Sequence, residues 1–87
     1  MKTTIVIPNK KGLHARASAK IAEAAARFKC TITISKDGHD VDARSVMGLM
    51  MLGAPMGSTI EISAEGVDAE EAVTALVALI GVKFGED

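Results

Sequence analysis

The sequence predicts one α+β domain of two layers, in which amphipathic helices cover one face of a four-stranded sheet. Three observations lead to this expectation. Short segments that are β-branched or alternate between apolar and polar residues occur four times in 87 residues, and helix-forming segments separate them. The hydrophobic fraction is 48%, enough for the modest core of one domain. Two phenylalanines are the only aromatic residues, so the core has to be aliphatic.

The first strand and the first helix are predicted from local composition. Residues 3–7 are mostly β-branched, and Pro8 ends the strand that they form. Residues 9–13 form a loop. Alanine content and the helical spacing of apolar side chains then predict a helix from residue 15 to about residue 28.

A hairpin is expected next. Residues 31–35 alternate as a strand, the pair Asp37-Gly38 is a strong signal for a two-residue turn, and residues 41–43 form the returning strand. His39 follows the turn and is expected to be exposed without a functional role. Cys30 precedes the hairpin and is expected to be a small buried apolar residue.

The second half of the chain adds a short helix, a strand and a long helix. The short helix covers residues 46–52 and the strand covers residues 59–64. Asp68 and Glu71 predict a capped start for a final helix over residues 69–83. The last three residues, Gly-Glu-Asp, form a polar tail. The element order is βαββαβα, but the pattern alone does not fix the order of the strands within the sheet.

Composition excludes several classes of protein. The longest apolar stretch, residues 72–82, is too short to span a bilayer, and the N-terminus lacks the features of a signal peptide. The single Cys30 allows no intramolecular disulfide and contributes to no metal-ligand cluster. We therefore expect a cytoplasmic protein without membrane insertion, bound metal or cofactor.

The charge is small overall but unevenly distributed. The net charge is −1, yet nine Lys and Arg stand against four Asp and Glu through Ser45, and one Lys stands against seven acids thereafter. Lys10, Lys11, Arg16 and Lys20 surround one histidine, where they would attract anions or acidic protein surfaces. Nucleic acid is not expected as a partner, because the chain lacks aromatic stacking residues and an overall positive charge.

That histidine, His14, lies where a glycine-containing loop meets the first helix. The first backbone N–H groups of a helix lack intrahelical partners and favour anions. Gly12 allows a tight turn, Arg16 adds a permanent cation, and neutral imidazole is a good nucleophile. These parts suit a histidine that accepts a phosphoryl group. From spacing alone, a capping histidine on a solvated surface is the favoured interpretation, and both remain open at this point. Hydrolase chemistry is not supported, since the chain has no G-x-S-x-G motif and no evident carboxylate pair.

Two segments, "GLHARASAK" and "ARSVMGLMMLGAPMGSTIEISAEGVDAEEAV", resemble HPr, the histidine phosphocarrier family of the bacterial phosphotransferase system. The resemblance extends over nearly the whole chain. It implies one HPr-like domain over residues 1–87, with the fold of an open-faced β-sandwich. The four-stranded antiparallel sheet of that fold has the strand order 1-4-2-3, and three helices cover one face.

The resemblance also implies roles for the residues of the loop and helix start. His14 would be phosphorylated at Nδ1, taking phosphate from the phosphoenolpyruvate-dependent Enzyme I and passing it to an Enzyme IIA domain. Arg16 would be the neighbouring active-site cation, and Gly12, Ala15 and Ala17 would form the supporting loop and helix start. The protein would be a monomeric carrier in transport and regulation, without turnover of its own.

Ser45 and the helix that follows it have two possible uses. Ser45 is a natural N-cap, and the resemblance matches it to a serine that HPr kinase/phosphorylase phosphorylates. The same resemblance places Val46, Met47 and Met50 on a partner-docking patch. A methionine stripe serves core packing as often as contact, so both interpretations are open. The alternative function is a non-catalytic regulatory module that acts through Ser45 and residues 46–52.

The chain departs from the family pattern at two places. Many members have proline at the position of Ala17. Alanine in place of proline should loosen the loop and change the lability of the phosphate. The loop "PNKKG" is also longer and more basic than is usual in sugar-system members. "HARAS" resembles the nitrogen-related branch of the system, which favours a regulatory phosphorelay over bulk sugar uptake.

Overall fold

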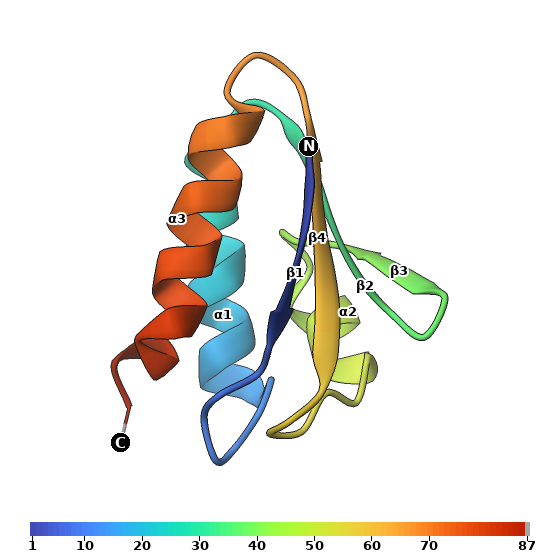
Figure 1. Cartoon of the computed structure of the whole chain (residues 1–87), viewed down its shortest axis with the longest axis vertical. Helices are drawn as coiled ribbons and strands as arrows, with labels where there is room; N and C mark the ends of the chain where they lie inside the picture. Colours follow the sequence, from blue (N-terminus) through green and yellow to red (C-terminus); the bar gives the residue numbers. More distant parts are fainter. Residues whose placement is uncertain (87) are drawn as a thin grey trace.

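The computed structural model describes residues 1–86, and it shows a sheet with helices packed against one side (Figure 1). The element order βαββαβα agrees with the prediction. A short 3-10 turn, η1, follows the last helix. The elements are β1 (Lys2–Val6), α1 (Ala15–Ala25), β2 (Thr31–Lys36), β3 (His39–Asp42), α2 (Val46–Met51), β4 (Thr59–Glu65), α3 (Ala69–Gly81) and η1 (Lys83–Gly85).

The four strands form one antiparallel sheet in the order β1-β4-β2-β3, as the family resemblance implied. The last strand in the sequence, β4, therefore lies between β1 and β2. The N-terminal ammonium of Met1 donates a hydrogen bond of 2.8 Å to the carbonyl oxygen of Ala64, at the end of β4. Local pattern could not reveal this order, because the connections into and out of β4 are not tight turns.

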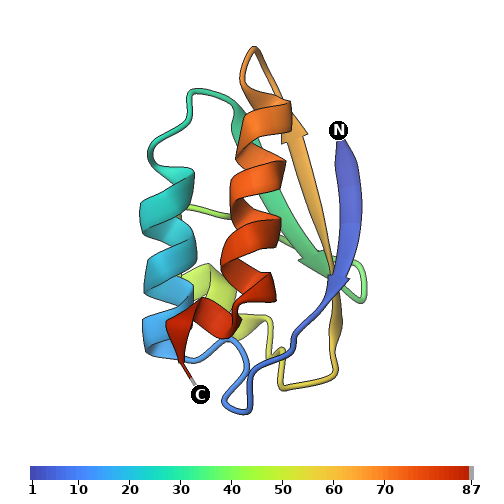
Figure 2. The same ribbon diagram turned by 60° about the vertical axis from the view of Figure 1, so that its left-hand side comes forward.

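One face of the sheet is apolar and carries the helices. In β4 the buried residues Ile60, Ile62 and Ala64 alternate with more exposed polar residues, as expected of a strand with one solvated face. Helices α1 and α3 lie side by side over the apolar face (Figure 2), and α2 contacts α1 and β3. The core is aliphatic apart from Phe84, as predicted. The largest fully buried apolar side chains are Phe84, Ile7, Ile21, Ile32, Ile34, Leu49, Ile60, Ile62, Leu76 and Ile80.

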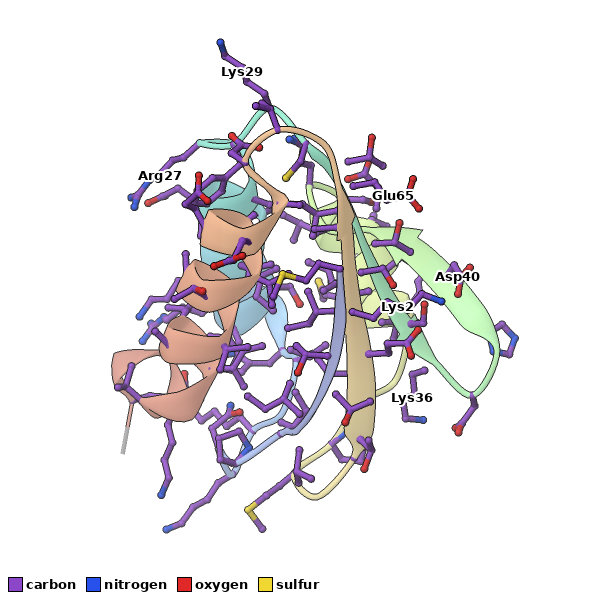
Figure 3. All side chains as sticks on the ribbon, turned by 45° about the horizontal axis from the view of Figure 1, so that its top comes forward. Lys2, Arg27, Lys29, Lys36, Asp40 and Glu65 are labelled. Atoms are coloured by element: carbon purple, nitrogen blue, oxygen red, sulfur yellow. The ribbon has the colours of Figure 1, made fainter. Side chains whose placement is uncertain are left out.

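The opposite face of the sheet is open and polar. Figure 3 shows the side chains of Lys2, Lys36, Asp40 and Glu65 on the side of the sheet away from α1 and α3. The fold is thus the two-layer, open-faced β-sandwich that the resemblance implied. Among residues 1–86, no helix has both the length and the apolar character needed to cross a membrane.

Several predicted boundaries were wrong by a few residues. Helix α1 ends at Ala25 rather than near residue 28, because the N–H groups of Arg27 and Phe28 bond to carbonyls three residues back, which tightens the chain into turns. Strand β3 begins at His39, which pairs with Lys36 directly across the two-residue turn. The remaining strands shift or extend by one residue. The final helix ends at Gly81, and the chain then enters η1.

The predicted capping pair of the last helix is not formed. Asp68 occupies the N-cap position of α3, but its side chain makes no cap hydrogen bond there, so the pairing with Glu71 was a wrong prediction. The Asp68 carboxylate instead accepts hydrogen bonds from the backbone N–H groups of Lys29, at 2.8 Å, and Cys30, at 2.9 Å. Asp68 therefore links the α1–β2 connection to the start of α3 through hydrogen bonds. Cys30 is buried, as predicted.

Candidate functional site

The loop between β1 and α1 is pressed against the segment that follows α2. Gly12 has a φ of +64°, and a β-carbon on it would overlap the carbonyl oxygen of Ala54 and lie 2.8 Å from Cα of Pro55. The next residue, Leu13, donates its backbone N–H to the same Ala54 carbonyl at 2.9 Å. Glycine is therefore required at residue 12 by both conformation and space.

His14 is the N-cap residue of α1, but its ring does not cap the helix. The carbonyl oxygen of His14 accepts the N–H of Ser18 at 2.9 Å, while its imidazole makes no cap hydrogen bond. The hydroxyl of Ser18, which is fully buried, donates to the carbonyl of Leu13 at 3.1 Å and holds the helix start to the loop. The imidazole is thus not occupied in capping, which weakens the interpretation of His14 as a simple cap.

The imidazole of His14 meets a carboxylate from the other end of the chain. Its Nε2 lies 2.9 Å from Oε2 and 3.2 Å from Oε1 of Glu86. The His14 and Glu86 side chains are 26% and 16% exposed, so solvent reaches both of them, and the ring more than the carboxylate. No hydrogen bond among residues 1–86 involves Nδ1 of His14.

The hydrogen bonds of Glu86 keep it ionised. The amide of Asn9 donates a hydrogen bond to Glu86 Oε1 at 2.7 Å, and this bond is the largest cause that lowers the pKa of the Glu86 carboxyl. The hydrogen bond and charge of His14 and the charge of Lys11 lower this pKa further, while burial raises it. Asn9 is fully buried. Glu86 is therefore a carboxylate at neutral pH, and it presents only hydrogen-bond acceptors to the ring.

Glu86 was not predicted as a site residue, because the sequence places it in a polar tail. One signal could have found it: Phe84 is one of two aromatic residues in the chain, and a large aromatic side chain that enters the core brings the segment around it along. Phe84 is 1% exposed and anchors the segment next to the first helix. The tail residue Asp87 lies outside the described residues.

The predicted residues of the first helical turn have different environments. Ala15 and Arg16 are exposed at the start of α1, and Ala17 is fully buried. The unpaired N–H groups of a first turn and the Arg16 guanidinium both favour an anion at this end of the helix. Within residues 1–86, Arg16 forms no ion pair. The described part of the chain contains no cluster of three or more side chains able to hold a metal ion.

Ser45 is the N-cap of α2, as the sequence predicted. Its hydroxyl oxygen accepts the N–H of Gly48 at 3.0 Å, and its carbonyl oxygen accepts the N–H of Leu49 at 3.0 Å. A β-carbon on Gly48 would lie 3.0 Å from the Ser45 hydroxyl oxygen and 3.2 Å from Cβ of Val41. Glycine at residue 48 thus lets α2 pack closely against its own cap and against β3.

The side chains of α2 divide into a buried and an exposed set. Leu49 is fully buried, whereas Val46, Met47 and Met50 are 36%, 70% and 43% exposed. The structure therefore decides against the interpretation of the methionines as core residues. These three residues form an exposed apolar surface, here called the α2 patch. Helix α2 packs against α1 and lies toward the end of the molecule at which α1 begins (Figure 1).

The site at His14 is a surface feature rather than a substrate pocket. A hollow of about 570 Å³ lies between the β2–β3 turn and α2. His14 does not line it. An imidazole at the surface suits contact with another protein better than enclosure of a small molecule.

Comparison with known proteins gives relatives that match this chain over nearly their whole length. The model of one family, described as "PTS HPr component phosphorylation site", matches residues 1–81. The phosphocarrier protein HPr of Cupriavidus necator is 51% identical, over 97% of this chain and 92% of that protein. The phosphocarrier protein NPr of Shewanella violacea is 43% identical, over 99% of this chain and 94% of that protein.

Solved structures of HPr proteins are also similar to this chain. HPr-C-His from Thermoanaerobacter tengcongensis superposes with a TM-score of 0.96 at 48% identity, covering 100% of this chain and 98% of that one. An HPr dimer from the same organism is 50% identical, with a TM-score of 0.80 and 97% of both chains covered.

Proposed function

Because this chain belongs to the HPr family of phosphocarrier proteins, we propose that it accepts a phosphoryl group on His14 from Enzyme I and transfers it to an Enzyme IIA domain. The observation that carries the proposal is the position of His14 at the start of α1, with an imidazole that is solvent-accessible and makes no cap hydrogen bond. The same position favours an anion, through the helix N–H groups and Arg16.

The transfer needs little from the protein besides a nucleophile and positive charge. Nδ1 of His14 attacks the phosphorus, a phosphorus–nitrogen bond forms, and the bond from phosphorus to the donor breaks with its electron pair leaving on the donor. Passing the group to the IIA domain reverses these events, and the electron pair returns to Nδ1. The N–H groups of Ala15, Arg16 and Ala17 and the Arg16 guanidinium stabilise the phosphoryl oxygens. The chain is a carrier without turnover of its own.

The partners are proteins that fit an apolar patch beside basic residues. The α2 patch supplies adaptable methionine contacts, which suit a carrier that binds several partners in turn. Lys10, Lys11 and Arg16 are exposed near His14 and favour acidic partner surfaces. The protein acts in the cytoplasm as a monomer, which size-exclusion chromatography tests against the dimeric arrangement seen for an HPr of Thermoanaerobacter tengcongensis.

Ser45 supplies regulation in this proposal. Phosphorylation of its hydroxyl by an HPr kinase/phosphorylase would add a charge of about −1.5 to −2 at the start of α2. The first turn of α2 contains no acidic residue, so the helix would accept this charge. The added charge lies next to Val46 and would repel acidic partners from the α2 patch.

Labelling with radioactive phosphoenolpyruvate and Enzyme I tests the proposal. We expect label that is labile in acid and stable in alkali, lost in His14→Ala and retained in His39→Ala, whose ring is on the exposed hairpin. Label that persists in His14→Ala would overturn the proposal. Onward transfer to sugar-type and nitrogen-type IIA domains, compared in parallel, tests the branch, and we expect the nitrogen type to be the faster acceptor.

A second candidate is a regulatory binding module, which the exposed α2 patch and the capping Ser45 favour. In that case His14→Ala would leave partner binding unchanged, and Ser45→Asp would disrupt it.

A further inference from the structure

The chain reaches His14 a second time, at its C-terminal end, through a turn of unusual backbone. Lys83, Phe84 and Gly85 have φ values of 58°, 58° and 76°. Three consecutive residues in the left-handed region are rare, and side chains with a β-carbon disfavour it. Backbone strain of this kind is retained where the surrounding structure enforces it, often at a functional site.

Two contacts enforce this turn. Phe84 is 1% exposed and belongs to the core, and the ammonium of Lys20 on α1 donates a hydrogen bond to the Phe84 carbonyl oxygen. Together they fix the turn against the first helix. As a result Glu86, the residue directly after the turn, contacts His14, which lies 72 residues away in the sequence.

Asn9 fixes the orientation of the Glu86 carboxylate. Its amide nitrogen donates to the carbonyl oxygen of Gly12 at 2.9 Å and to Glu86 Oε1 at 2.7 Å. Both of these partners are acceptors, so the side-chain amide of Asn9 has to present its NH₂ group to them. Glu86 Oε1 is held by Asn9, and Oε2 is left facing Nε2 of His14 at 2.9 Å.

The Glu86 carboxylate determines which nitrogen of the His14 ring carries the hydrogen. A carboxylate only accepts hydrogen bonds, so Nε2 has to donate and therefore carries the hydrogen. In a neutral imidazole with hydrogen on Nε2, the free lone pair is on Nδ1. We propose that Glu86 is a positioning residue that holds His14 in the Nε2–H tautomer and thereby makes Nδ1 the nucleophile.

Glu86 also acts during the transfer, and this part rests on the proposed phosphocarrier function. As Nδ1 forms its bond to phosphorus and the donor bond breaks, the ring becomes positively charged, while the hydrogen stays on Nε2. The carboxylate, 2.9 Å away, stabilises that charge. The neighbouring charged side chains Lys11 and Arg16 are cations, so neither of them can stabilise a positive ring in place of Glu86.

The substitution Glu86→Gln makes the sharpest test because it should reverse the tautomer. The Asn9 NH₂ group requires an acceptor, so the oxygen of the new amide has to face Asn9 and its NH₂ has to face Nε2. Nε2 would then accept, and the hydrogen would move to Nδ1. Glu86→Ala removes both contacts and should leave a mixture of tautomers. Glu65→Gln, an exposed change on β4 with the same loss of charge, is the control.

The measurement is the pair of nitrogen chemical shifts of the His14 ring in the unphosphorylated protein, by NMR at a pH where the ring is neutral. We expect protonated Nε2 in the unmodified protein and in Glu65→Gln, and protonated Nδ1 in Glu86→Gln. The rate of phosphorylation by Enzyme I should fall at least about tenfold in Glu86→Gln, as is common when a group that orients a histidine is lost.

An unchanged tautomer in Glu86→Gln, in a protein whose thermal melting shows that it is folded, would overturn the inference. A normal phosphorylation rate in a variant whose tautomer has reversed would overturn it as well. Failure of the phosphocarrier function itself is distinguishable, because the unmodified protein would then take no label on His14 whatever its tautomer.

Discussion

Gly12 and Ala54 are so close that a β-carbon at residue 12 would overlap the Ala54 carbonyl oxygen. This contact joins the loop before His14 to the segment after α2. The N–H of Leu13 donates a hydrogen bond to the same carbonyl and connects the two segments a second time. The geometry of the histidine loop therefore depends on a backbone-to-backbone approach.

Gly12→Ala should destabilise the protein by about 3 kcal/mol, since it adds a steric overlap to a left-handed backbone. The matched control is Gly53→Ala. Gly53 has a φ of 61°, but a β-carbon on it would meet no other atom within 4 Å, so its cost should be about 1 kcal/mol. Urea denaturation measures both, and equal losses of stability would contradict the account.

Ser45→Ala should lower the free energy of unfolding by about 1 kcal/mol, because the N–H of Gly48 loses its acceptor. Ser45→Asn keeps a good N-cap and should stay within about 0.5 kcal/mol of the unmodified protein. Thermal and urea denaturation test this pair. If the alanine variant were as stable as the asparagine variant, the cap would have no energetic role.

Met47→Glu should weaken binding to Enzyme I about tenfold, which is ~1.4 kcal/mol, because it puts a charge on the exposed α2 patch. Stability should hardly change, since the side chain is 70% exposed. The control is Val67→Glu, an 89% exposed position in the turn between β4 and α3. Titration calorimetry gives both affinities, and an equal loss in the two variants would show a non-specific effect of charge.

Acid should weaken the link between Asp68 and the α1–β2 connection. The N–H of Lys29 is the largest cause that lowers the pKa of the Asp68 carboxyl, and hydrogen bonds from Cys30 add to it against an opposing effect of burial. Because the folded-state pKa lies below the unfolded value, the stabilisation is fully present above the unfolded pKa. It is lost as the pH falls through the folded-state pKa.

Asp68→Asn should therefore be less stable than the unmodified protein at neutral pH, and the difference should shrink in acid. Urea denaturation at a series of pH values measures it, with the exposed Glu65→Gln as control. A difference that stays constant down to strongly acidic pH would contradict this assignment.

Local sequence signals predicted those features of the fold that depend on residues close together in the sequence. The element order, the Ser45 cap and the aliphatic core follow from propensity, capping chemistry and periodicity. His14 was recognisable because a glycine, an imidazole and an arginine stand together before a helix. The order of the strands came from the family resemblance, since β4 enters the sheet between two strands far earlier in the sequence.

The contacts that were missed connect distant parts of the chain. Asp68 has the sequence of a capping residue, but the N–H groups that it binds are 38 and 39 residues away. Glu86 similarly meets His14 only because Phe84 is buried and the turn around it doubles back. No local pattern contains these pairings, because they depend on how the two long helices pack side by side.

We propose that His14 relays phosphate between two proteins. A relay assay tests this directly: labelled phosphoenolpyruvate, Enzyme I, this chain and an Enzyme IIA domain are combined, and label on the IIA domain is measured over time. The account predicts label on the IIA domain with the unmodified chain and with His39→Ala, and only background with His14→Ala. Label that reaches the IIA domain equally fast with His14→Ala would contradict it.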